Sequence, residues 1–163
     1  MYKFKAPYDK LVQIITWGTI LLLAAIFLII ALGNEVPSWF KVFLLIVFGA
    51  ILYITNAYSP LGYEIEQESV IVRRISHPVI IKLEKIQEVK IDPEAATLKA
   101  IRCGSGGLFG FFGTFYSGRL KVHKRYITSR KNSVVIVAHK NYVISPEKPD
   151  LFVQLLQERI NKG

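Results

Sequence analysis

The sequence predicts an α+β protein in which a hairpin of two long apolar helices precedes a compact β-rich domain. Two apolar runs predict the helices, since residues 11–32 contain no charged side chain and residues 39–58 contain only Lys41. After residue 58 apolar and polar side chains alternate, as in half-buried strands, until one apolar stripe at helical spacing ends the chain. We therefore divide the chain into an arm and hairpin over residues 1–58 and one domain over residues 59–163.

Each apolar run is long enough to cross a membrane as a helix. About 20 residues at a rise of about 1.5 Å span the hydrocarbon core, and the 163-residue chain is 52% hydrophobic. A cleaved signal peptide fits the first run poorly, because its apolar region would be about 7–15 residues long. Between the runs, Gly33 and Pro37 favour a turn, so the helices form a transmembrane hairpin with both chain ends on one side.

The distribution of Lys and Arg predicts which side that is. Lys3, Lys5 and Lys10 precede the first run, and residues 59–163 contain 17 Lys and Arg against 10 Asp and Glu, whereas the loop between the runs has only Lys41 at its edge. The positive-inside rule therefore predicts a multi-pass protein of the cell membrane with both termini in the cytoplasm. The single cysteine, Cys103, is consistent with a reducing compartment.

The domain after the membrane is predicted to contain short strands and one helix. Pro149 opens the helix, whose apolar stripe would cover the open end of a bent sheet; the stripe consists of Leu151, Phe152, Leu155, Leu156 and Ile160. Segments rich in β-branched and aromatic residues and bounded by turn residues are the strands. They are residues 61–66, 70–75, 79–83, 86–91, 97–102, 119–128, 134–139 and 141–145.

This order of strands and a final helix resembles the pleckstrin-homology-like (PH-like) fold. The segments similar to small bacterial membrane proteins with a PH-like domain after two helices are VIVRR (70–74), VIIKL (79–83), IQEV (86–89), RCGSGGLFGFFG (102–113) and YVISP (142–146). The resemblance implies a bent antiparallel β-sheet or barrel capped by a C-terminal α-helix. It implies no activity, because the family is largely uncharacterised in function.

A segment rich in Gly and Phe, residues 104–116, is the first candidate contact site. It lacks the Gly-Lys-Ser/Thr of a phosphate-binding loop. One interpretation is a long hairpin whose glycines supply positive φ and whose phenylalanines pack under the sheet. The other, which we favour as the functional one, is a loop that presents apolar side chains to a partner or to the membrane interface; the candidates are Leu108, Phe109, Phe111, Phe112 and Phe115.

A basic segment that follows is the second candidate. Residues 119–131 contain no acidic side chain, and alternation places Lys121, His123 and Arg125 on one face of a strand. An anionic leaflet attracts basic groups by roughly 1 kcal/mol each, but an ordinary solvated strand explains the pattern equally well. The candidate basic face consists of Arg119, Lys121, Lys124 and Arg125. Phosphoinositide binding is not carried over from the fold, because the first hairpin turn contains Glu66 and Glu68.

No catalytic, cofactor or metal site is predicted. His77, His123, His139 and Cys103 have no partners at useful spacing, and the acidic cluster from Glu84 to Glu94 lacks the pattern of a calcium loop. Nucleic acid is not an expected partner, because no recognition element accompanies the positive charge.

These observations predict a non-enzymatic, membrane-anchored binding module at the cytoplasmic face. It would engage a protein partner or the anionic inner leaflet, and a role in envelope stress or self-protection is an analogy to other small bacterial PH-like proteins. The alternative is a regulatory or structural subunit of a larger membrane complex that acts through its helices, where Gly18, Ala25, Gly49 and Ala50 permit close packing. The sequence leaves the oligomeric state open.

The topology is testable by cysteine labelling of intact cells from outside. We expect a cysteine introduced at Ser38 to react and one introduced near Glu147 to be protected, because Lys and Arg flank the hairpin on the side of the chain ends. Labelling near Glu147 without labelling at Ser38 would contradict the predicted orientation.

Overall fold

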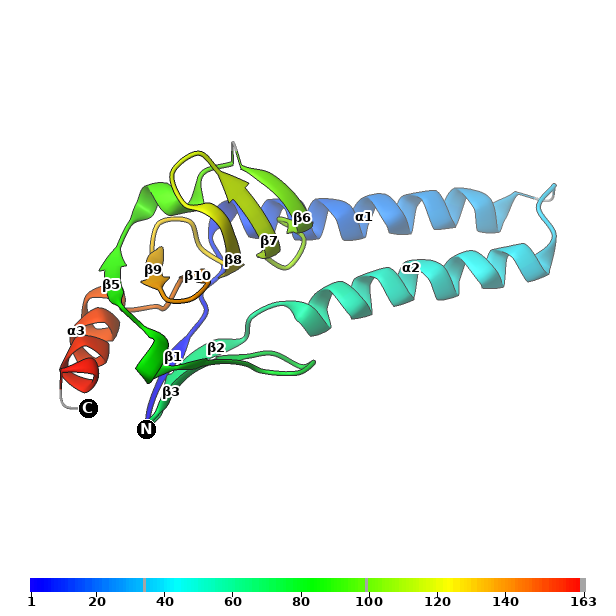
Figure 1. Cartoon of the computed structure of the whole chain (residues 1–163). Helices are drawn as coiled ribbons and strands as arrows, with labels where there is room; N and C mark the ends of the chain where they lie inside the picture. The colour runs from blue at the N-terminus through cyan, green and yellow to red at the C-terminus, as the bar shows by residue number, and fades with distance from the viewer. Residues whose placement is uncertain (34, 99, 162–163) are drawn as a thin grey trace.

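The computed structural model describes residues 1–33, 35–98 and 100–161. A hairpin of two long helices extends from one side of a β-rich domain (Figure 1). In chain order the elements are β1 (Tyr2–Lys5), α1 (Lys10–Leu32), α2 (Ser38–Tyr58), β2 (Gly62–Ile65), β3 (Ser69–Arg73), β4 (Val79–Lys82), the 3₁₀-helix η1 (Leu83–Lys85), β5 (Glu88–Ile91), the 3₁₀-helix η2 (Pro93–Ala96), β6 (Ile101–Gly106), β7 (Phe111–Ser117), β8 (Lys121–Ile127), β9 (Val134–Val137), β10 (Asn141–Ile144) and α3 (Pro149–Ile160).

The two predicted apolar helices are present, and both are long and apolar enough to cross a membrane. Asp9 caps α1, because its side chain accepts a hydrogen bond from the Val12 amide at 2.9 Å. At the other end of α1, the Lys41 ammonium donates to the carbonyl oxygens of Ala31 and Gly33 at 2.9 and 2.7 Å. The one charge in the second apolar run is therefore hydrogen-bonded across the hairpin turn. Asn34 in that turn lies outside the described residues.

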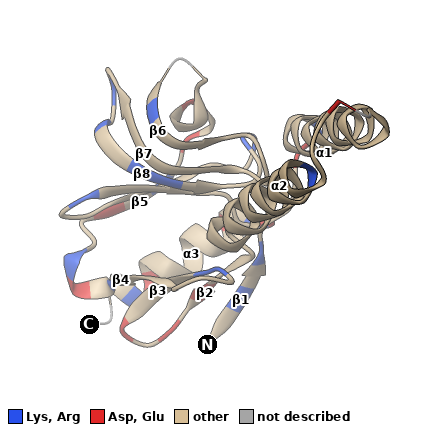
Figure 2. Cartoon of the chain, turned by 90° about the vertical axis from the view of Figure 1, so that its right-hand side faces the viewer, with Lys and Arg blue, Asp and Glu red and all other residues tan. Residues whose placement is uncertain are grey.

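The strands form two sheets in the orders β1-β2-β3-β4 and β5-β9-β10-β8-β7-β6. All neighbours are antiparallel except β8 and β10, which are parallel. Viewed from the helix end, the two sheets lie on opposite sides of the domain (Figure 2). The predicted bent, mostly antiparallel architecture with a C-terminal helix is confirmed, although the sheets do not close into a barrel.

Three elements differ from the sequence-based prediction. The N-terminal arm forms a strand, β1, in which only Phe4 points into the core, so its apolar pattern is too short to read. The strand expected at residues 97–102 begins only at Ile101, because η2 and the residues after it occupy the preceding stretch, where Lys99 lies outside the described residues. The segment rich in Gly and Phe, for which the sequence leaves open a hairpin or a presented loop, forms a hairpin. It contributes half of β6 and all but the last residue of β7, a strand that the sequence analysis does not predict.

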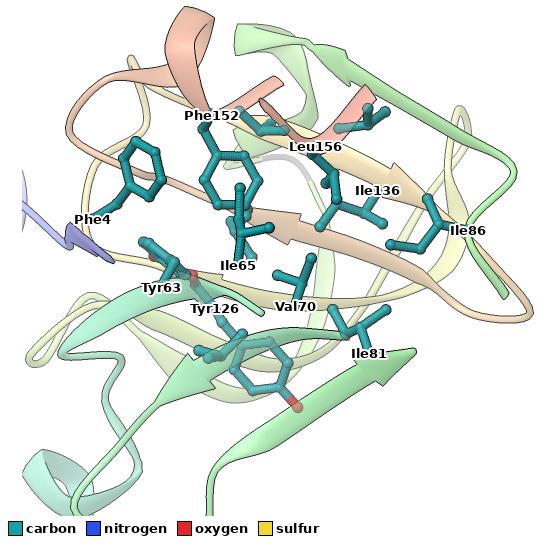
Figure 3. Close-up of a cluster of buried hydrophobic side chains, with 14 of the residues drawn as sticks. Phe4, Tyr63, Ile65, Val70, Ile81, Ile86, Tyr126, Ile136, Phe152 and Leu156 are labelled. Atoms are coloured by element: carbon teal, nitrogen blue, oxygen red, sulfur yellow. The ribbon is translucent and has the colours of Figure 1, made fainter. Parts of the chain in front are cut away.

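The main core lies between the two sheets and α3 (Figure 3). Phe152 and Leu156 of α3 are fully buried there, and the Phe152 ring packs edge-on against Phe4 at 5.1 Å between centroids. Leu155 and Ile160 are half-buried and also pack against this core. The predicted stripe is therefore confirmed at four of its five positions, and Leu151 is exposed.

A buried tyrosine joins the two sheets. The Tyr63 hydroxyl of β2 donates to the Tyr126 carbonyl oxygen of β8 at 2.7 Å and accepts from the Ser145 amide at 3.1 Å. The Ser145 hydroxyl accepts in turn from the Thr128 amide at 3.0 Å. Burial raises the pKa of Tyr63 to about 12, because an ionised phenolate would lose its hydration.

We predict that Tyr63→Phe lowers the free energy of unfolding by about 1–3 kcal/mol at pH 8, because the buried Ser145 amide and Tyr126 carbonyl would lose their partner. The pKa of Tyr63 is raised on folding, so the phenol contributes stability below pH 10 that is lost between about pH 10 and 12. The difference between wild type and variant should therefore shrink over that range. Denaturant unfolding in detergent measures it, with Tyr142→Phe as the control; a difference that grows above pH 10 would contradict the assignment.

Candidate functional site

The hairpin β6–β7 ends in a tip, residues 107–110, that contacts both long helices. The Phe109 amide donates to the Thr16 hydroxyl of α1 at 2.9 Å. The hydroxyl of Ser59, which follows α2, donates to the Phe109 carbonyl oxygen at 2.6 Å. One residue of the tip is thus hydrogen-bonded to both sides of the helix hairpin, and Figure 1 shows the tip beside α1.

Close approach to α1 explains the glycine at position 107. A Cβ at Gly107 would lie 2.4 Å from Cδ1 of Ile15, and its φ of 132° is a conformation that side chains other than glycine rarely adopt. Phe109 has a positive φ of 56° without being glycine. The tip conformation is therefore fitted to the chain's own helices, which supply part of the contact that the sequence led us to expect from a partner.

The structure places three of the five candidate side chains of this hairpin in the core. Phe111, Phe112 and Phe115 are 2%, 8% and 2% exposed. The expectation that they form an exposed contact surface is therefore wrong, because alternate residues of β7 face either the main core or a second apolar cluster with Val12 of α1. Leu108 and Phe109 are half-buried at the tip. Only these two remain available to a partner.

The candidate basic face also contains both buried and exposed side chains. Arg125 is only 1% exposed, and its guanidinium lies 4.5 Å from the centre of the Phe115 ring. Its Nε donates to Nε2 of His123 at 3.0 Å, and Nη1 donates to the Thr97 carbonyl oxygen at 2.8 Å. The expected solvent-facing row is thus wrong for His123 and Arg125, whose face of β8 points inward.

Hydrogen bonds define the charge states of this buried pair. Since Nε2 of His123 accepts from Arg125, Nδ1 carries the proton and donates to the Lys121 carbonyl oxygen at 2.9 Å. Burial lowers the pKa of His123, and the Arg125 charge lowers it further, against the effect of the backbone hydrogen bond. Burial also lowers the pKa of Arg125 to about 10, so the guanidinium stays charged at neutral pH. Its Nη2 has no hydrogen-bond partner among the described residues.

The remaining basic side chains surround a surface depression of about 530 Å³, formed by the first half of β8 and the turn between β9 and β10. The described residues that line it include no Asp or Glu. They are Thr114, Arg119, Leu120, Lys121, Val122, His123, Lys124, His139, Lys140 and Asn141.

The basic groups at this depression differ in their partners. Arg119 forms ion pairs with Asp92 and Glu94. The Lys124 ammonium donates to the Thr114 hydroxyl at 2.6 Å. Sequence reasoning missed the contribution of Lys140, which reaches the site because β10 lies parallel to β8 with Asn141 opposite His123. A parallel pair of strands distant in the chain leaves no periodic signal from which to predict it.

The family model described as a bacterial PH domain matches residues 61–160. The chain belongs to the bacterial PH domain family. The match runs from the start of β2 through α3 and confirms the resemblance noted from the sequence. No curated protein and no solved structure matches the chain.

PH domains are generally non-catalytic binding modules, so we look for function in the binding surfaces of this one. In the part of the chain that the structure describes, no three His, Cys, Asp or Glu side chains lie together as metal ligands would. Cys103 is exposed and free on β6, the edge strand of the PH domain's larger sheet.

The difference between the buried rings of β7 and the half-buried ring at the tip can be tested by truncating these side chains one at a time. Phe111→Ala should lower the free energy of unfolding by about 3–5 kcal/mol, because a fully buried ring leaves a cavity. Phe109→Ala should cost clearly less, since that side chain is half-buried and the tip is held through its backbone. Denaturant unfolding of the full chain in detergent compares the two. Equal losses would show that Phe109 is a core residue as well.

Proposed function

We propose that this chain is a non-enzymatic, membrane-anchored PH module that contacts the inner leaflet from the cytoplasmic side. The observation that carries the proposal is the position of two turns of the PH domain at the end of the helix hairpin. The β6–β7 tip is bonded to Thr16 and Ser59. In the β3–β4 turn, the Ser76 amide donates to the Ala57 carbonyl oxygen at 2.9 Å.

The β3–β4 turn carries side chains suited to a membrane interface. Ile75 is 51% exposed, and the Arg74 guanidinium lies 5.6 Å from the centre of the Tyr58 ring at the end of α2. Basic groups beside anionic headgroups and aromatic rings at the headgroup level are both favourable. Trp39, at the opposite end of α2, is 71% exposed, which supports a helix that spans the bilayer. Half-buried Leu108 in the tip adds apolar surface at the same end of the hairpin.

The PH domain is attached to both helices, which supports a fixed distance between the domain and the leaflet. Strand β1, before α1, pairs with β2, after α2. Asp9 accepts from the Arg130 amide at 3.0 Å, which adds a further connection between the start of α1 and the domain. A domain held in this way engages a lipid surface or a protein partner at one orientation, and the excess of Lys and Arg in residues 59–163 favours the cytoplasmic side.

A second function, as a subunit of a larger membrane complex, is favoured by one observation. A Cβ placed at Gly18 or Gly49 would meet nothing within 4 Å, so these small residues are not used in packing α1 against α2. Their faces are open to another helix. Purification of partners from native membranes with and without the PH domain discriminates the two functions, because partners of a complex subunit would follow the helices alone.

The leaflet contact can be measured with spin labels in lipid nanodiscs. In a Cys103→Ser background, we expect a label at Ile75 to lie at the headgroup depth, because its turn touches the end of α2. A label at Ile80, which is 58% exposed on β4, is the matched control and should lie in water. Relaxation by oxygen and by a water-soluble nickel complex reports both depths. Equal, fully aqueous values would contradict the proposed contact.

A further inference from the structure

The basic depression beside β8 combines three lysines that no carboxylate offsets, beside Arg119, which is paired with Asp92 and Glu94. Among the described residues, Lys121, Lys124 and Lys140 form no ion pair, although all three line or border one concave surface. Like charges around one concave surface raise its potential and attract anions. A bound anion would remove this repulsion.

The backbone of Lys121 adds a second observation. Its φ of 53° lies in the left-handed region, which costs a side chain more than it costs glycine. The turn before β8 nevertheless places a lysine there, and its side chain lines the depression. Strain of this kind, held by the surrounding structure, is found most often at binding and active sites.

A third observation is the buried charge behind the depression. His123 lines the depression, and the Arg125 guanidinium donates a hydrogen bond to His123 from the interior side. That guanidinium is 1% exposed and has no carboxylate partner among the residues described. Because the charge lies in a poorly screened interior, its field reaches the depression with little attenuation.

The position of the depression separates it from the leaflet contact. It lies toward the β7–β8 turn, and the tip that touches the helices lies at the other end of β7. At about 3.3 Å per strand residue, Lys124, opposite Thr114, lies about 10 Å from Phe111 at the tip end of β7, and Lys121, opposite Ser117, lies about 20 Å from it. Both separations exceed the Debye length of about 8 Å at physiological ionic strength. In Figures 1 and 2 the β7–β8 turn points away from the helix hairpin. The ligand therefore comes from solution.

We propose that this depression binds a soluble, phosphate-bearing ligand with several negative charges. Lysine ammonium groups bind phosphate oxygens as point charges, and three of them around one concavity match a ligand with more than one charged group. The Thr114 hydroxyl, which now accepts from Lys124, supplies a further polar partner. The site shares no residue with the turns of the proposed leaflet contact, so either assignment can fail without the other.

The test uses the full chain in neutral phosphatidylcholine nanodiscs, titrated with tripolyphosphate by calorimetry. We expect one site per chain, with an affinity that falls as salt rises. Lys124→Ala and Lys140→Ala should each weaken binding about tenfold, the effect of losing one charge-assisted hydrogen bond. Lys121→Gly should weaken it similarly without loss of thermal stability, since glycine suits the backbone at this position. Lys85→Ala, an exposed lysine of η1, is the matched control and should bind as wild type.

Three outcomes would overturn the proposal. The first is no binding at millimolar tripolyphosphate, and the second is an equal loss in Lys85→Ala, which would mean unspecific attraction to a basic domain. The third is equally tight binding of citrate, which would assign the depression to carboxylates. A further arm adds phosphatidylserine to the nanodiscs at constant ionic strength. Unchanged tripolyphosphate affinity supports a soluble ligand, and its abolition would show that the leaflet itself fills the site.

Discussion

The pairing of β1 with β2 is the constraint on which the rest of the structure depends. These strands lie immediately before α1 and after α2, and their antiparallel register sets Phe4 opposite Tyr63 and Lys5 opposite Gly62. The helix hairpin is thus closed at one end by its turn and at the other by a sheet. Ordering residues 2–5 also completes the main core through Phe4. The same strand pair therefore joins the ends of the helix hairpin and takes part in the core of the domain.

Further contacts beside this strand pair hold the helix hairpin and the domain in one relative orientation. Asp9 caps α1 and also accepts from the Arg130 amide, while Val12, one turn later, is fully buried in the second apolar cluster. The β6–β7 tip then reaches between the helix ends through Phe109. The Asp9–Arg130 and Thr16–Phe109 hydrogen bonds join segments more than 90 residues apart in the chain. Any force that separates or rotates the helices must therefore act on the PH domain as well.

Elements whose burial leaves a pattern within one segment could be predicted from the sequence, and contacts between separate segments could not. Long runs without charge define α1 and α2 because no soluble fold tolerates them at the surface, and β-branched runs define β3, β4 and β9 for the same reason of burial. Strand β1 escaped prediction because Phe4 alone carries its signal. Arg125 was placed at the surface because an arginine is rarely buried without a carboxylate, and its partners, Phe115 and Thr97, come from other segments. The depression was only half predicted, since Lys140 joins it through a parallel strand pair.

The placement of the carboxylates, more than the number of cations, gives the PH domain its electrostatic asymmetry. Glu64 is buried between Lys3 and Arg73 on the smaller sheet, with distances of 3.3 and 2.9 Å. Asp92 and Glu94 both pair with Arg119 at the rim of the depression, which leaves the lysines beyond it without a counter-ion. His123 is kept neutral by its hydrogen bonds, so it separates Arg125 from those lysines without adding to their repulsion. Ion pairs thus offset the charges of Lys3, Arg73 and Arg119, whereas the lysines at the concave surface are left accessible to a mobile anion.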